Sequence, residues 1–279
     1  MKRIESRLNY GVLFAGALGL ALVWTIAVFE MNRSERSAIR ESELRTSVQA
    51  RVFAEYSRST LKRVNEFLLD NRSNWGNDWQ AFASEVKKSQ ENIADITFQL
   101  AVIDQDGLLA FSNLAKPNDR TDLSEREHFK VHKQAVGVDQ LFISRPVKGK
   151  VSGKWSIQFT RPIYKDGQFA GVIVASISPD MFSDFSQTLS LGANSSVTTV
   201  RSTGEILARY PALNDSLGKL TDSTEIANSS TLAGNFTKKS VADGVERIFG
   251  FYKLTDYGLS FVVGEATQDA LVPYYQTRK

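Results

Sequence analysis

The stretch from Arg145 to Ile163, RPVKGKVSGKWSIQFTRPI, gathers cations and hydroxyl groups around a predicted strand. Its side chains alternate between an apolar and a polar row, which are Trp155, Ile157, Phe159 and Ile163, and Lys154, Ser156, Gln158 and Thr160. Two cations, Arg145 and Lys154, beside hydroxyl and amide groups suit a carboxylate or another small anion, because charge-assisted hydrogen bonds strengthen where water is excluded. The alternative is a hairpin mouth whose cations are solvated, since any half-exposed strand alternates.

Two histidines, His128 and His132, are spaced i, i+4 and share one face if their segment is helical. That spacing suits a zinc pair, but HFKVH lacks the glutamate of the metalloprotease helix motif and no third ligand is indicated, so we expect no metal site. The chain has no cysteine, which excludes disulfides and thiol nucleophiles. With no GxSxG elbow and no paired-carboxylate motif, we expect neither catalytic residues nor a cofactor, and no enzyme activity in this chain.

Length and charge limit the possible partners. A chain of 279 residues has room for two small domains, and its net charge of +3 is small for that length. The basic residues are spread among acidic ones, so nothing resembles a nucleic-acid-binding stripe, and nucleic acid is not an expected partner.

An uncharged run covers residues 8–29, LNYGVLFAGALGLALVWTIAVF, and is close to the ~20 apolar residues that span a bilayer. No small-residue cleavage site follows it, which favours an anchor over a removed signal peptide. Lys2, Arg3 and Arg7 precede the run, so we expect residues 1–7 to be cytoplasmic and residues 8–29 to form a transmembrane helix. The rest of the chain is then extracytoplasmic.

A long helix is predicted to follow, because neither Gly nor Pro occurs between Leu20 and Trp75. We assign residues 30–92 to this stalk helix and a connecting helix. The later part of the stalk carries an apolar stripe, made of Leu44, Val48, Val52, Tyr56, Leu61, Val64, Phe67 and Leu68. The stripe either packs against the domain that follows or joins two stalks in a homodimer.

Two pairs of segments repeat in the same order after Phe98. LAVIDQDGLLAFS (100–112) and VTTVRSTGEILARY (197–210) each predict a strand, a turn and a strand. YKDGQFAGVIVASIS, from Tyr164, matches YKLTDYGLSFVVGEA, from Tyr252. The repetition predicts tandem α/β modules of roughly 90 residues each.

The chain resembles the double Cache extracytoplasmic sensor domains at DLSEREHF (122–129), FISRPVKGKVSGKWSIQFTRPI (142–163) and FAGVIVASISPDMF (169–182). The resemblance implies an α/β fold in which a long N-terminal helix, transmembrane and then stalk, is followed by two tandem PAS-like modules with antiparallel sheets. Residues 93–190 would be the membrane-distal, ligand-binding module and residues 191–268 the membrane-proximal module. Residues 269–279 would lead into a second transmembrane helix, so we expect a piece of a longer receptor.

The resemblance is strongest to sensors that precede GGDEF diguanylate cyclase domains. It therefore implies an output that makes c-di-GMP, an anchor in the bacterial inner membrane and a periplasmic sensor domain. The alternatives are the sensor of a histidine kinase or chemoreceptor, or a partner-interaction module that binds no small ligand.

The resemblance also places the ligand between the distal sheet and the REHF segment. Arg126 stands where the amino-acid-binding branch of the family has an arginine that holds the ligand carboxylate. His128 and Phe129 occupy its aromatic places, Val131 replaces an acidic residue, and Ser176 stands where a second amine-binding aspartate is expected. Because the carboxylate contact is kept and the amine contacts are missing, an organic acid or another small anion is favoured over an α-amino acid.

Nine residues are therefore expected to bind the ligand: Arg126, His128, Phe129, Ser144, Arg145, Lys154, Trp155, Ser156 and Ser176. The alternative for Arg126 is an ion pair with Asp122 or Glu125. A protonated His128 that assists Arg126 would make the response depend on pH.

The second module offers fewer candidates. Arg201, Arg209 and Tyr210 could form a polar site there, but the resemblance implies a module that transmits the signal without binding, so no site is assigned to it.

Overall fold

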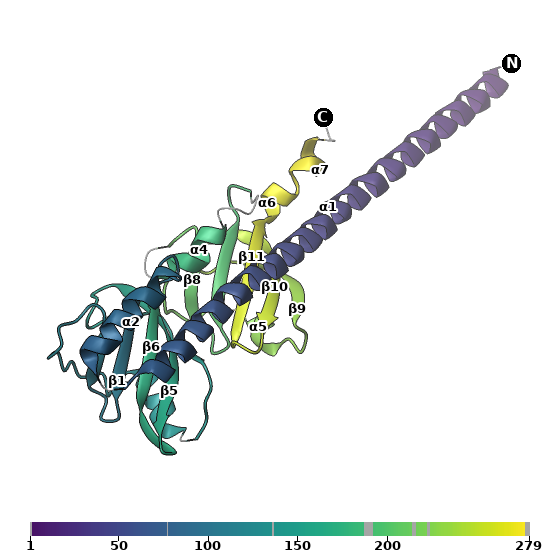
Figure 1. The fold of residues 1–279 in the computed structure, drawn as a ribbon. Coiled ribbons are helices and arrows are strands. Elements are labelled where there is room, and N and C mark those ends of the chain that lie inside the picture. Colours follow the sequence, from purple (N-terminus) through teal and green to yellow (C-terminus); the bar gives the residue numbers. More distant parts are fainter. Residues whose placement is uncertain are drawn as a thin grey trace.

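One helix, α1 (Lys2–Asn74), runs along the whole molecule in this computed structural model, with two antiparallel sheets beside its second half (Figure 1). The structure describes residues 2–76, 78–135, 137–186, 192–213, 216–221 and 224–276. The helix ends one residue before Trp75, as the absence of Gly and Pro predicts. Within the described residues, none of the helices combines the length and apolar character needed to cross a bilayer, so the structure does not support the membrane span expected over residues 8–29.

The first sheet lies in the module that the resemblance places far from the membrane, called the distal module below. Its strands follow the order β2-β1-β6-β5-β3, and the short strand β4 pairs with β5 outside that order. The strands are β1 (Thr97–Asp104), β2 (Leu109–Ser112), β3 (Phe142–Ile143), β4 (Val147–Lys148), β5 (Trp155–Lys165) and β6 (Gln168–Ile177). Two helices complete the module, α2 (Trp79–Glu91) before the first strand and α3 (Glu127–Gln134) between β2 and β3.

The second sheet repeats this plan in the proximal module. Its order is β8-β7-β11-β10-β9, so each of its strands has a counterpart at the same place in the distal sheet. The strands are β7 (Ser196–Arg201), β8 (Ile206–Tyr210), β9 (Ala233–Lys239), β10 (Glu246–Leu254) and β11 (Leu259–Ala266). The helices are α4 (Asp180–Ser186), α5 (Thr224–Asn228), α6 (Thr267–Ala270) and α7 (Val272–Gln276). Helix α4 precedes the module boundary expected at residue 190, but it contacts β7 and β8 of the second sheet. The repetition predicted from the two pairs of segments is confirmed.

Both sheets bury one face against α1. Leu61, Val64 and Leu68 of the helix are buried in one core with Phe159 of β5 and Phe261 of β11. Burial of such side chains contributes roughly 1.5–3 kcal/mol each. This part of the predicted apolar stripe therefore packs against the modules.

The N-terminal part of the same stripe is exposed. Leu44, Val48 and Val52 have 64%, 60% and 48% of their surface accessible. The two alternatives for the stripe thus concern different parts of the helix. The C-terminal part packs against the modules, and the N-terminal part is exposed.

Helix α1 and the proximal sheet also meet through backbone and charge. A Cβ atom on Gly250 of β10 would lie 2.4 Å from the backbone nitrogen of Ser47, so only glycine permits this approach. Glu265 of β11 accepts hydrogen bonds from Ser42 at 2.7 Å and from both nitrogens of one edge of Arg45, the nearer at 2.7 Å. The last strand is thereby held to the helix just before α6 and α7, which lie beside it (Figure 1).

Candidate functional site

A small cavity lies on the face of the distal sheet that points away from α1. On β1, β5 and β6 the residues that line it alternate with those that pack against α1, because successive side chains of a strand point to opposite faces. Its volume is about 40 Å³, room for no more than a few waters. The lining residues are Gln99, Ile103, Leu109, Leu123, Arg126, His128, Val147, Gly149, Lys150, Val151, Gln158, Val174 and Ser176.

Neutral polar side chains form the floor of this cavity. The hydroxyl of Ser176 lies 3.2 Å from the amide oxygen of Gln99 and 2.7 Å from that of Gln158. The two amide groups donate in turn to Ser112, at 2.9 Å, and to Ser156, at 2.7 Å. All five residues are buried, so the network satisfies polar groups that would otherwise be costly to bury.

Two cations close the mouth of the cavity. Arg126 donates from Nη2 to the backbone oxygen of Lys148 at 3.1 Å, and Lys150 donates to the backbone oxygen of Asp122 at 2.7 Å. These bonds hold the hairpin segment 147–151, which includes the lining residue Val151, over the segment that leads into α3. Arg126 forms neither of the ion pairs that we considered for it, since Glu125 pairs with Lys130 instead.

The two histidines lie on α3 and are both buried, at 5% and 2% exposure for His128 and His132. Burial lowers the pKa of His128 to about 3, with Arg126 contributing, and the pKa of His132 to about 4. Both rings are therefore neutral at physiological pH, and the predicted protonated His128 is wrong because its site is too poorly hydrated for a cation. His132 Nε2 lies 2.9 Å from the hydroxyl of Thr160.

One polar atom at this cavity has no partner. His128 Nδ1 is buried and makes no hydrogen bond within the described part of the chain, although a neutral imidazole offers one donor and one acceptor nitrogen. An unmade bond of a buried polar group costs about 1–3 kcal/mol. A ligand oxygen or nitrogen beside His128 would remove that cost. No group of three or more metal-ligating side chains occurs among the residues described.

The distal cavity brings together three of the nine predicted residues, Arg126, His128 and Ser176. Phe129 packs below them in a buried apolar cluster with Val172 and Leu109, and does not line the cavity.

Five predicted residues do not line it. Ser144 and Ser156 are buried in hydrogen bonds, the first with the backbone nitrogen of Gln158 at 2.9 Å. Arg145 is exposed, and Lys154 lies over the ring of Phe98, 5.5 Å from its centre.

Trp155 departs from the predicted apolar face. Ile157 and Phe159 are fully buried against α1, as expected, but Trp155 is 52% exposed. The reason is its place at the start of β5. Strand β6 pairs with β5 only from Ile157 onward, so Trp155 has β4 alone as a neighbour and lies beyond the covered sheet.

Sequence reasoning missed Gln99 and Lys150 as lining residues. Gln99 alternates with apolar residues in TFQLAVID, and the same period-2 pattern that singled out Gln158 would have found it. Lys150 lies in a turn, and its position depends on how the hairpin folds over α3, for which the sequence carries no comparable signal.

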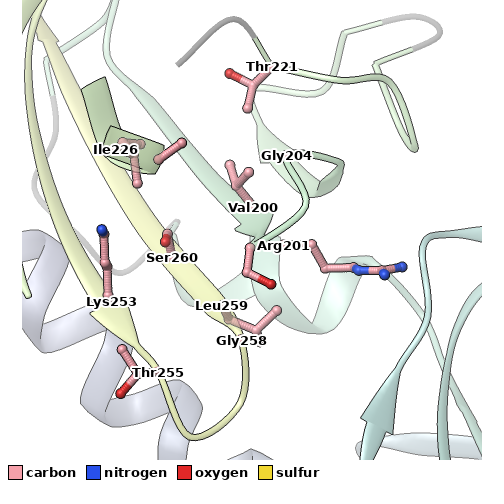
Figure 2. Close-up of a pocket in the computed structure, with 12 residues that line it drawn as sticks. Val200, Arg201, Gly204, Thr221, Ile226, Lys253, Thr255, Gly258, Leu259 and Ser260 are labelled. Carbon is pink, nitrogen blue, oxygen red and sulfur yellow. The ribbon is translucent and has the colours of Figure 1, made fainter. Parts of the chain in front are cut away.

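The proximal module has two larger cavities, on the face of its sheet away from α1. The first has a volume of about 320 Å³ and lies between β7, β11 and the short helix α5 (Figure 2). Ile226, Val200 and Ser260 face it, whereas the guanidinium of Arg201 points away toward the neighbouring module. The second has a volume of about 390 Å³ and is lined by Arg209 and by apolar residues of all five strands of the sheet.

Arg201 connects the two modules. Its guanidinium donates to Glu127, the first residue of α3, at 3.1 Å and lies 5.5 Å from the ring centre of Phe142 of β3. Arg201 is only 11% exposed in its side chain, and Glu127 is 35% exposed. The helix that carries Arg126 and His128 is therefore tied to the proximal sheet. Arg201 and Arg209 do not gather in one polar site, because Arg201 contacts the distal module and Arg209 lines the second cavity.

Comparison with known proteins places these features in a family. A family model described as a Cache domain, in its double form, matches residues 31–274. The extracellular domain of a protein described as a histidine kinase, rpHK1S-Z16, is 25% identical with a TM-score of 0.74, over 84% of this chain and 98% of that one. No curated protein matches the chain significantly.

Two chemoreceptor domains share the fold at lower identity. The ligand-binding domain of PctB from Pseudomonas aeruginosa PAO1, solved with L-arginine, is 16% identical with a TM-score of 0.63, over 82% of this chain and 89% of that one. The ligand-binding domain of CtaA from Pseudomonas fluorescens, solved with L-isoleucine, is 18% identical with a TM-score of 0.63, over 85% and 97%.

Proposed function

The chain belongs to the Cache domain family, and from that premise we propose that it is the extracytoplasmic ligand-sensing part of a bacterial transmembrane receptor. The proposed output is a diguanylate cyclase, on the similarity of the segments at 122–129, 142–163 and 169–182 to sensors of that class. The output of a histidine kinase is the second candidate, and the likeness to the extracellular domain of rpHK1S-Z16 favours it. Membrane attachment through residues 8–29 and a periplasmic location belong to the same proposal.

The ligand is a small carboxylate, held in the distal module. The observation that carries this is the unpartnered Nδ1 of buried His128, which lines the same cavity as the guanidinium of Arg126. Arg126 supplies charge and His128 supplies one neutral hydrogen bond to the carboxylate oxygens. Gln99, Gln158 and Ser176 offer neutral groups to the rest of the ligand.

The composition of the lining argues against an α-amino acid. No aspartate or glutamate lines the described cavity, so an ammonium group would meet only amide and hydroxyl oxygens. PctB and CtaA were solved with amino acids, which makes the amino acid the first competitor to test. Those ligands differ from the proposed one by their ammonium group, for which this cavity supplies no carboxylate.

Binding requires the cavity to open, because about 40 Å³ is well below the roughly 300 Å³ of typical ligand sites. A ligand carboxylate takes the place of the Lys148 backbone oxygen on Arg126 and releases segment 147–151. The ligand stabilises the open state by its differential affinity for the two states. Movement of α3 then reaches the proximal sheet through Glu127 and Arg201, and reaches α1 through Glu265.

The test is a thermal-shift screen of the chain against organic acids, amino acids and small amines. A ligand at about 100 times its dissociation constant adds about 2.7 kcal/mol to the free energy of unfolding. A carboxylate should raise the melting temperature of the wild type and not of Arg126→Ala. Lys154→Ala is the matched control, since Lys154 is a predicted cation that does not line the cavity.

Two results would contradict the assignment. An unaltered rise in melting temperature in Arg126→Ala would contradict the proposed site. A response confined to amino acids would contradict the proposed ligand class. No response to any compound would favour a module whose input is another protein.

A homodimer through α1 is part of the proposal. The exposed residues Leu44, Val48 and Val52 are spaced i, i+4 and present an apolar strip along one face. Val48→Lys should convert the dimer to a monomer in light scattering, whereas Lys62→Ala, an exposed change elsewhere on α1, should not. A monomeric wild type would refute the dimer.

A further inference from the structure

The larger proximal cavity runs across the sheet from a cation to an aromatic pair. Arg209 of β8 pairs in register with Thr198 of β7, which pairs with Val262 of β11, and all three line the cavity. Beyond them, the rings of Phe249 and Phe236 stack with centres 5.1 Å apart. Its volume of about 390 Å³ lies within the range of small-molecule sites. The cavity therefore has one charged end and one apolar end.

Arg209, which lines the charged end, belongs to a group of three side chains with more positive than negative charge. Asp243 accepts from Arg209 at 2.7 Å and from Arg247 at 2.8 Å, so one carboxylate serves two guanidinium groups. The side chains of Arg209 and Arg247 are only 6% and 4% exposed. Among the described residues, no other carboxylate forms an ion pair with either arginine, which leaves one buried positive charge uncompensated.

Arg209 is also incompletely hydrogen-bonded. Its Nε has no partner within the described chain, and its Nη1 has only the hydroxyl of Thr198 at 3.4 Å. Burial lowers the pKa of Arg209, although Asp243 opposes this. Lys238, in register with Arg247 on the neighbouring strand, is balanced by Glu225, 3.3 Å away. Lys219, which also lines the cavity, is exposed to solvent. The unbalanced buried charge therefore belongs to the arginine pair.

We propose that this cavity is a second ligand site, which takes a monocarboxylate with an apolar chain or ring. The carboxylate compensates the Arg209–Asp243–Arg247 group, and the apolar part lies over Val262 and the Phe236–Phe249 pair. This site is distinct from the distal cavity and does not depend on it, because the two occupy different sheets. The receptor domain then responds to two chemical inputs.

The test is isothermal titration calorimetry of the chain with hexanoate, hexan-1-ol and hexylamine. Hexanoate should bind at one proximal site, and the neutral and cationic analogues should bind at least about tenfold more weakly. Arg209→Met removes the charge, and Val262→Phe fills the apolar part while leaving the three charged residues in place. Each should weaken hexanoate binding by about tenfold or more. Arg145→Met, an exposed cation that lines neither cavity, should bind hexanoate like the wild type.

Circular dichroism of each variant separates lost binding from lost folding. If Arg209→Met fails to fold, the proposal is tested by hexanoate binding to Val262→Phe and by the relative affinities of the three probes for the wild type. The proposal is overturned if millimolar hexanoate gives no binding heat with the wild type, if the three probes bind alike, or if folded Val262→Phe binds hexanoate unchanged. A distal response that is lost in Arg126→Ala and kept in Val262→Phe would leave the function proposed above intact in any of these cases.

Discussion

The two modules have the same strand order, yet the sheet faces that point away from α1 differ in space and charge. The distal face carries a neutral network of Gln99, Gln158 and Ser176 around about 40 Å³ of space. The proximal face carries the Arg209–Asp243–Arg247 group beside about 390 Å³. Strand order thus fixes where a cavity lies in this fold, and the side chains at a few outward strand positions decide what it accepts.

The opposite faces are alike. Both sheets cover α1 with a continuous apolar core, and the helix contributes Leu61 and Val64 to that core without a break between the modules. The difference between the modules is therefore confined to one face of each sheet, which makes it accessible to single substitutions.

The largest effect expected of a single substitution comes from the shared packing on α1. Gly250→Val places a side chain into the backbone of Thr46 and Ser47, so we expect the free energy of unfolding to fall by about 3 kcal/mol. Urea denaturation followed by circular dichroism measures it. Gly76→Val is the control, since nothing lies within 4 Å of its Cβ position. A loss below about 0.5 kcal/mol in Gly250→Val would mean that the proximal sheet does not approach the helix this closely.

Acid should affect the distal module first, because both histidines lie there. Their pKa values, about 3 and about 4 when folded, are below the value near 6.5 of an unfolded histidine. The unfolded chain binds more protons between these values, so stability is complete above about pH 6.5 and falls as the pH decreases. From pH 7 to about pH 5 the loss is on the order of 2 kcal/mol for each histidine.

Amide hydrogen exchange resolves this effect by module. Protection should decrease in β5 and β6 at pH 5 after correction for intrinsic exchange, while β10 and β11 change less. Asp243 begins to lose its charge only at much lower pH. Its interactions with the two arginines and with the backbone hold its pKa at about 2. Equal loss in both sheets would contradict the assignment of the acid response to His128 and His132.

The smallest effect concerns the contact between the modules. Glu127→Gln and Arg201→Met, each alone and combined, should give a coupling free energy of about 1 kcal/mol in a double-mutant cycle, since the pair is only partly exposed. The measurement is urea denaturation of all four proteins. Glu125→Gln with Arg201→Met is the matched cycle and should give no coupling, because Glu125 pairs with Lys130. Zero coupling for Glu127 and Arg201 would leave α3 without its link to the proximal sheet.

Local patterns predicted the fold well. The absence of Gly and Pro between Leu20 and Trp75 predicted an unbroken α1, and the two repeated pairs of segments predicted sheets of the same plan. Alternation in β5 identified Ile157 and Phe159 as core residues. These features depend on neighbours along the chain, which is why a sequence pattern contains them.

The site was predicted only in part, because it depends on contacts between distant segments. Arg126, His128 and Ser176 meet at one cavity, but the protonation of His128 depends on its burial, which its own segment does not reveal. Trp155 fits the strand pattern and is exposed because β6 ends too early to cover it. The proximal cavity was missed since Asp243 approaches Arg209 only through the turn between β9 and β10.

The unbroken course of α1 has a mechanical consequence. At about 1.5 Å per residue its 73 residues extend over roughly 110 Å, and from residue 20 to its end it contains no Gly or Pro at which a kink would be expected. A shift of the helix along its own axis at the distal sheet must then appear with nearly the same amplitude at the far end. The distance between a spin label near the N-terminal end of α1 and a second label on either sheet would report how far that sheet slides along the helix when its cavity is filled.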